Sequence, residues 1–201
     1  MKKTLLLIGL IGVVLVTSKI IYNKYRVVVP EVDINSSEIG WSGKSISDGH
    51  TGKIKLSKAE IQFKNDKLIG GVFEADMRSI TCTDIADTAD NRHFIEHIAN
   101  EDFFEVNKYP TASFIIEEVK DLGGNRFEVS GKMKIKNKEN QLTFTANVAP
   151  TSKGKRVSAL IDIDRTLYGI EYGAKGKPGS EKDWFILNEF TLNINIVTGN
   201  E

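Results

Sequence analysis

The stretch FEVSGKMKI, residues 127–135, decides the fold class. Apolar residues and one glycine occupy every second position, and polar residues fill the positions between them. Successive side chains of a β-strand point to opposite faces, so this period of two predicts a strand with one buried face and one face in water. The predicted buried face consists of Phe127, Val129, Gly131, Met133 and Ile135.

The same alternation recurs in residues 142–148, 157–163 and 184–196. Ile69, Phe73, Ala75 and Met77 share one predicted face, and so do Ala112, Phe114 and Ile116. About eight antiparallel strands at hairpin spacing predict a closed barrel or a sandwich.

The ends and irregularities of these strands are also visible in the sequence. Two hairpin turns are predicted at Asn65-Asp66 and Gly123-Gly124-Asn125, because Asn and Gly tolerate positive φ. The apolar phase changes between Leu56 and Ala59, as a β-bulge would produce.

One segment departs from the period of two. Residues 90–100 carry Phe94, Ile95 and Ile98 at helical spacing, with Asp90 available to cap the first turn. We therefore expect one short helix packed over part of the sheet.

Composition limits the function classes. The 201 residues suffice for one barrel-sized domain. Lys plus Arg and Asp plus Glu both total 27, so no basic excess favours a nucleic-acid partner. Cys82 is the only cysteine, which excludes an internal disulfide and leaves no thiolate set for a structural zinc site. We expect Cys82 to be a bystander and the protein to need no cofactor.

The N-terminus predicts export. Lys2 and Lys3 precede an uncharged apolar run over residues 4–16, which is typical of a secretory signal. Cleavage after Ser18 and retention of residues 5–22 as a membrane anchor both remain open. We assign residues 1–26 to this signal peptide or anchor and residues 27–201 to the barrel.

Three clusters contain residue types that could form a chemical site. Residues 93–97 read HFIEH, a pattern of some zinc peptidases, with His93 and His97 one helical turn apart. No third ligand is evident, so a solvated helix face is favoured over a zinc hydrolase. For His50 we expect a structural hydrogen bond. For the Asp162, Asp164, Arg165 and Tyr168 group we expect ion pairing through Arg165, and we predict no catalytic residues and no metal site.

The inward aromatic and methionine side chains either fill a core or line a cavity. Several inward partners are small, namely Gly71, Ala75, Ala112, Gly131, Ala146 and Ala159. Because small partners leave volume unfilled, a cavity is favoured; a barrel of eight strands is wide enough to hold one small ligand. The predicted ligand-binding residues are Phe73, Met77, Phe114, Phe127, Met133, Phe144 and Phe190.

Several stretches resemble the YceI-like proteins, also described as polyisoprenoid-binding or lipocalin-like lipid-binding domains. They are HTG at 50–52, LIGGVF at 68–73, DMRSI at 76–80, DFFEVNKYPTASF at 102–114 and IDRTLYGI at 163–170. These stretches occur in the family's order and span residues 32–197, so the resemblance covers the whole predicted domain.

The resemblance implies an all-β fold, an antiparallel eight-stranded lipocalin-like barrel with a long apolar pocket. It also implies non-enzymatic storage or transport of an isoprenoid or other amphiphilic lipid in the periplasm or cell envelope. The alternative is a barrel with a filled core that acts as a structural or interaction module through its surface loops. Ligand identity, membrane attachment through the N-terminal segment, and formation of a homodimer are left open.

Overall fold

The computed structural model describes residues 26–199 of the chain. These residues form nine strands: β1 (Val27–Val28), β2 (Glu38–Ser45), β3 (Gly49–Lys64), β4 (Lys67–Cys82), β5 (Thr111–Gly123), β6 (Arg126–Ile135), β7 (Lys138–Thr151), β8 (Gly154–Asp164) and β9 (Ile186–Val197). The helical elements are α2 (Thr88–Ala99) and the 3-10 helix η1 (Arg165–Tyr168).

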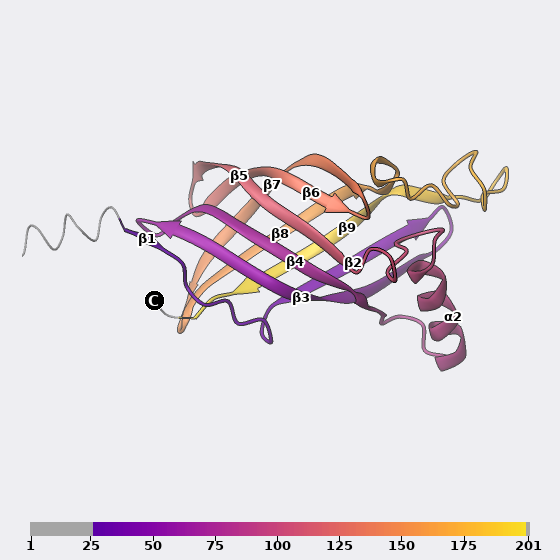
Figure 1. Ribbon diagram of the computed structural model, residues 1–201, viewed down its shortest axis with the longest axis horizontal. Helices are drawn as coiled ribbons and strands as arrows, with labels where there is room; N and C mark the ends of the chain where they lie inside the picture. The colour runs from indigo at the N-terminus through magenta and orange to yellow at the C-terminus, as the bar shows by residue number, and fades with distance from the viewer. Residues whose placement is uncertain (1–25, 200–201) are drawn as a thin grey trace, which may run out of the picture.

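Strands β2 to β9 form a closed antiparallel barrel (Figure 1). The strand order runs β3-β2-β9-β8-β7-β6-β5-β4, and β4 pairs back with β3 to close the ring. Strand β1 adds a two-residue pairing to β3, with Val27 opposite Lys64. The predicted fold class, an eight-stranded antiparallel barrel with one helix, is confirmed.

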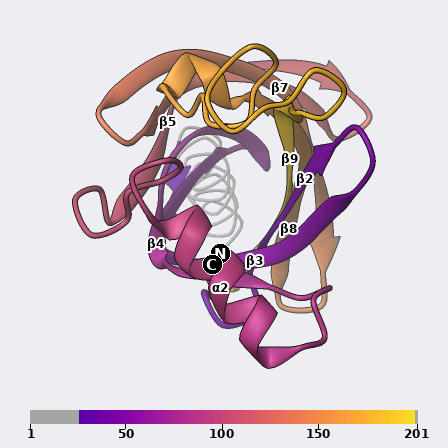
Figure 2. The same ribbon diagram turned by 90° about the vertical axis from the view of Figure 1, so that its right-hand side faces the viewer.

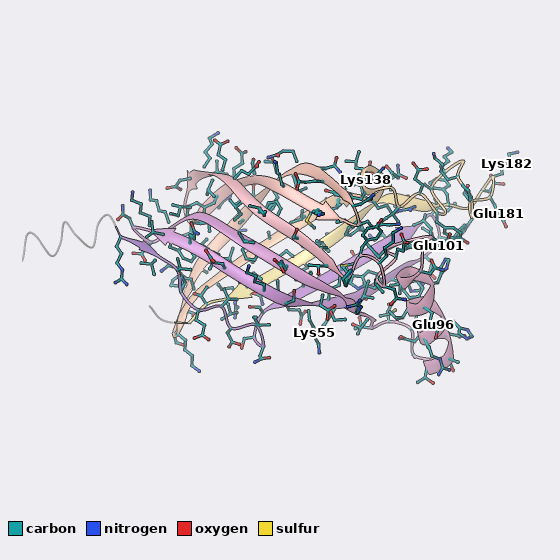
Figure 3. All side chains as sticks on the ribbon, in the orientation of Figure 1. Lys55, Glu96, Glu101, Lys138, Glu181 and Lys182 are labelled. Carbon is teal, nitrogen blue, oxygen red and sulfur yellow. The ribbon has the colours of Figure 1, made fainter. Side chains whose placement is uncertain are left out.

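The alternation that predicted the strands corresponds to the inner and outer faces of the barrel. Phe127, Val129, Gly131 and Ile135 are buried, and Met133 is half-buried. The phase change in β3 is a bulge, because the pairing register with β4 shifts between Leu56 and Lys58. Charged side chains such as Lys55 project from the outer surface into solvent (Figure 3).

Ile69 does not share the inner face with Phe73, contrary to the prediction. Its side chain is 39% exposed, whereas Leu68 and Gly70 on either side are buried. Gln62 pairs with Gly70 and Phe63 pairs with Leu68, so Ile69 is an extra residue without an opposite partner. This bulge reverses the phase of the strand, which simple alternation does not reveal.

The helix α2 begins earlier than predicted. Its N-cap is Asp87, not Asp90: the Asp87 carboxylate accepts hydrogen bonds from the amides of Ala89 at 2.8 Å and Asp90 at 3.0 Å. Ile98 is buried, while Phe94 and Ile95 are half-buried against the core. The helix lies at one end of the barrel, the end shared by the β2–β3 turn and the connection from η1 to β9 (Figure 2).

The N-terminal segment predicted as a signal or anchor lies outside the described residues, apart from Arg26. Within residues 26–199, no helix has the length and apolar character that crossing a bilayer requires.

Candidate ligand cavity

The interior of the barrel contains a cavity of about 590 Å³. Side chains from all eight barrel strands and from α2 contribute to its lining, and most of them are apolar. Cavities that hold small molecules usually measure about 300–1,000 Å³ and are lined by apolar side chains with a few polar groups. The cavity therefore has the size and the chemistry of a binding site for an apolar ligand.

The structure brings together six of the seven predicted ligand-binding residues. Phe73, Met77, Phe114, Met133, Phe144 and Phe190 all line the cavity. Phe127 does not: it is 4% exposed and forms part of the packed core. Phe127 follows the β5–β6 turn, which lies at the end of the barrel opposite α2 (Figure 1). Phe63 and Val148 are likewise buried and absent from the lining.

The predicted small residues have two different roles. Ala75, Ala112, Ala146 and Ala159 line the cavity, as expected of residues that leave volume unfilled. Gly71 and Gly131 are absent from the lining, and a Cβ atom at Gly131 would collide with the carbonyl oxygen of Ile115 on the neighbouring strand. Gly131 therefore permits close approach of β5 and β6 beside a register shift.

Further lining residues were not singled out by the sequence. Phe104, in the connection between α2 and β5, packs edge-on against Phe190 with ring centroids 6.3 Å apart. Trp41 on β2 lines the cavity and stacks on Phe94 of α2 at 6.3 Å. Phe104 belongs to a segment outside the strands, so alternation gave no signal for its inward position.

Several polar lining residues lie at the α2 end of the cavity, whereas Glu74 and Ser113 line it from the paired strands β4 and β5. Lys44 and Asp48 lie at the β2–β3 turn, His97 lies on α2, and Glu189 lies near the start of β9. Lys44, Asp48 and Glu189 are exposed, so the cavity reaches the surface here. An amphiphilic ligand would meet apolar walls inside the barrel and polar groups at this end.

Arg165 is the one buried cation of the cavity lining in the described chain, and it is 4% exposed. The expected ion pairing is wrong: its guanidinium donates hydrogen bonds to four backbone carbonyls, those of Leu187, Ile170, Tyr172 and Ile186, at 2.8–3.2 Å. The carboxylates of Asp162 and Asp164 instead accept hydrogen bonds from threonine hydroxyls. Burial lowers the pKa of Arg165. Its four bonds tie the η1–β9 connection to the barrel end.

His50 makes the structural hydrogen bond that was expected. Its Nδ1 lies 3.1 Å from Oδ2 of Asp84, and its ring packs 4.4 Å from that of Phe94. Burial opposes ionisation of Asp84, but hydrogen bonds from the Thr51 amide, the Cys82 thiol and His50 lower its pKa to about 2. Burial, followed by the hydrogen bond to Asp84, raises the pKa of the Cys82 thiol.

The HFIEH segment does not assemble a zinc-peptidase site with a third ligand within residues 26–199. His93 is exposed, while His97 is half-buried between the rings of Phe103 and Tyr172 at 5.1 and 4.9 Å. The two histidines therefore have different surroundings, and the His97 ring packs against aromatic rings at the end of the barrel.

Fold and cavity together define a class, the cavity-bearing antiparallel β-barrels. Residues 31–198 match the YceI-like domain, and the chain belongs to that family. A UPF0312 protein from two strains of Pseudomonas putida is 33% identical over 89 residues, which are 42% of this chain and 45% of that protein. The chain thus matches less than half the length of these relatives.

Solved structures share the architecture. The crystal structure of Burkholderia cenocepacia BcnA superposes with a TM-score of 0.69 at 22% identity, covering 83% of this chain and 98% of that one. A polyisoprenoid-binding domain from Saccharophagus degradans, described as implicated in plant cell wall breakdown, superposes with a TM-score of 0.60 at 12% identity. That match covers 88% of this chain and 100% of the neighbour.

Proposed function

We propose that the barrel binds an isoprenoid or another amphiphilic lipid, with the apolar tail inside the cavity and the polar head at the α2 end. The observation that carries the proposal is the cavity of about 590 Å³ with its predominantly apolar lining. The polyisoprenoid-binding domain among the structural neighbours supports the same ligand class. Phe73, Met77, Phe114, Met133, Phe144 and Phe190 are the proposed contact residues.

Burial of the tail supplies the affinity in this proposal. Each methylene group removed from water contributes about 0.8 kcal/mol, so ten groups contribute on the order of 8 kcal/mol. Association and ordering cost on the order of 4–15 kcal/mol. Tight binding therefore requires a long tail or a preformed slot, and the closed barrel supplies such a slot. No reacting group is required, so we propose a carrier or store of lipid and not an enzyme.

The proposed setting is the cell envelope. The apolar run after Lys2 and Lys3 is the feature that supports export, and it leaves a cleaved signal and a retained anchor equally compatible with a lipid carrier. The other candidate, an interaction module with a filled core, is disfavoured by the cavity, since a filled barrel leaves no such volume.

The experiment is native mass spectrometry of the exported protein, followed by organic extraction and identification of the lipid. We expect one apolar species at one molecule per chain. Phe144→Asp, which places a charge in the lining, should abolish that species. Gln141→Asp on the exposed face of the same strand is the matched control and should retain it. A folded wild-type protein that is empty and binds no added isoprenoid would contradict the proposal.

A further inference from the structure

Three metal-ligating side chains of different chemistry meet where β3 and β4 close the barrel. They are His50, Cys82 and Asp84, and one ligand atom from each lies within 4.8 Å of the other two. Within residues 26–199, this is the one group of three potential metal ligands that lie so close together. The Asp84 carboxylate is at the centre: Oδ2 lies 3.1 Å from Nδ1 of His50, and Oδ1 lies 3.1 Å from Sγ of Cys82.

The fold holds these donors in place through the backbone. Cys82 is the last residue of β4 and pairs with Gly52 of β3, two residues after His50. The amide of Thr51 donates to Oδ1 of Asp84 at 2.9 Å, and the amide of Thr83 donates to the carbonyl of Thr51 at 2.8 Å.

A side chain of α2 fixes the chain that follows β4. Nδ2 of Asn91 donates to the carbonyls of Cys82 and Ile85, both at 3.0 Å. The segment that carries both the thiol and the carboxylate is thereby tied to the helix at each side of Asp84. Three donors on two hydrogen-bonded strands and a tethered turn need only small side-chain adjustments to converge on one point.

We propose that His50, Cys82 and Asp84 form a binding site for a divalent borderline metal ion such as Zn²⁺. Tetrahedral zinc with bonds of about 2.0–2.3 Å places neighbouring donors about 3.3–3.6 Å apart. Nδ1 of His50 and Sγ of Cys82 each lie 3.1 Å from one oxygen of the Asp84 carboxylate, close to this spacing. With one ligand atom from each residue, the three donors lie within 4.8 Å of one another, so side-chain rotation must bring them closer around an ion. The mixed imidazole, thiolate and carboxylate set suits zinc, whereas Mg²⁺ and Ca²⁺ prefer oxygen ligands alone.

Charge and protons balance in this site. The thiol of Cys82 releases its proton to solvent as the sulfur–metal bond forms, and His50 binds as a neutral imidazole with its proton on Nε2. The thiolate and the Asp84 carboxylate together neutralise the two charges of the ion. The Thr51 amide remains on Asp84 as an outer-shell hydrogen bond, the kind of contact that orients a metal ligand.

Three protein ligands leave a fourth position for water or another group, as in open zinc sites. His50 also lines the lipid cavity at its α2 end, so the ion would lie beside the place proposed for the polar head of the ligand. The metal site itself rests on the side-chain geometry and does not depend on the proposed lipid function.

The test is titration of the chelator-treated, exported protein with Co²⁺, followed by displacement with Zn²⁺. We expect one equivalent to bind, with a thiolate-to-cobalt charge-transfer band in the near ultraviolet and the visible bands of tetrahedral cobalt. Cys82→Ser should remove the charge-transfer band and weaken binding by on the order of 100-fold or more, because loss of an outer-shell partner alone costs about 10–100-fold.

The matched control is His93→Asn on the exposed face of α2, which should leave the titration unchanged. Zn²⁺ should also raise the melting temperature of the wild-type protein and of His93→Asn, but not that of Cys82→Ser. The site is refuted if the folded wild-type protein shows no thiolate–cobalt band at equimolar metal. It is also refuted if both His50→Asn and Asp84→Asn retain the full wild-type titration. Neither readout involves lipid, so failure here is distinguishable from failure of the lipid proposal.

Discussion

The rings of Phe114 and Phe144 lie with their centroids 5.4 Å apart at an interplanar angle of 48°. They come from β5 and β7, the two neighbours of β6, and both line the cavity. Phe127 lies on β6 and shares their inward orientation, yet it is packed in the core and absent from the lining. Inward side chains of this barrel therefore either line the cavity or pack in a filled end of the barrel, depending on their position along the barrel axis.

This division predicts opposite effects of two alanine substitutions. Phe127→Ala should lower the free energy of unfolding by about 3–5 kcal/mol, because it empties a packed site, while the folded protein still carries lipid. Phe144→Ala should cost less stability and reduce the bound lipid. Urea unfolding and lipid extraction measure the two effects, and loss of lipid in a folded Phe127→Ala alone would contradict the assignment.

Filling the cavity should remove lipid without unfolding the barrel. Ala159→Phe places a ring in the cavity that the wild-type alanine lines. The lipid bound per chain should fall at least about tenfold, while stability changes by less than the 1–3 kcal/mol typical of overpacking a filled core. Ala149→Phe on the exposed face of β7 is the control and should leave the lipid content unchanged. Equal lipid in both variants would show that the cavity is not the binding site.

Removal of the Arg165 guanidinium should destabilise the fold. Arg165→Met leaves four backbone carbonyls without their donor. Each unsatisfied buried group costs about 1–3 kcal/mol, so we expect a total loss of at least about 3 kcal/mol. Arg165→Lys should not restore it, because an ammonium group cannot reproduce the planar fork. The midpoint of chemical denaturation measures the effect. Arg156→Met, at an exposed position, is the control and should leave the midpoint unchanged. An unchanged midpoint for Arg165→Met would refute the structural role of Arg165.

Close backbone approach at Gly52 should make this position intolerant of alanine. A Cβ atom there would collide with the carbonyl oxygen of Thr81 and with the ring of Trp41, at the closure of β3 on β4. We expect Gly52→Ala to lower the free energy of unfolding by about 1–3 kcal/mol or more. Gly43→Ala has open space at its Cβ position and should be nearly neutral. Thermal melts compare the two, and equal melting temperatures would contradict the inferred collision.

The cap of α2 should respond to acid. Hydrogen bonds from the amides of Asp90 and Ala89 lower the pKa of Asp87. A lowered folded-state pKa means that its contribution to stability is present above the unfolded value of about 3.9 and is lost as pH falls through the folded value. The protection factors of the amides in the first turn of α2, which correct for the slower intrinsic exchange in acid, should therefore fall on acidification in the wild type.

Two substitutions separate the charge of Asp87 from its capping hydrogen bonds. Asp87→Asn keeps a good capping residue without the charge, so protection of this turn should depend less on pH than in the wild type. Asp87→Ala should lose protection already at neutral pH. The same acid response in Asp87→Asn as in the wild type would exclude Asp87 as the titrating group.

Much of the fold was predictable from local sequence because strand geometry is local. A period of two specifies which side chains share a face, and it correctly placed Phe73, Phe114 and Phe144 on the inside. The helical spacing of Phe94, Ile95 and Ile98 predicted α2, and the phase change after Leu56 predicted a bulge. The bulge at Ile69 gave no comparable signal, because the glycines that follow it carry no side chain to mark the face.

Tertiary structure alone decided how the inward residues are used. Whether an inward ring meets packed neighbours or open space depends on its height in the closed barrel, which separates Phe127 from Phe144. The meeting of His50 with Cys82 and Asp84 likewise depends on the register in which β3 and β4 pair, since the first and last of these residues lie 34 positions apart. Alternation specifies faces along one strand; only closure of the ring brings distant strands into register around one cavity.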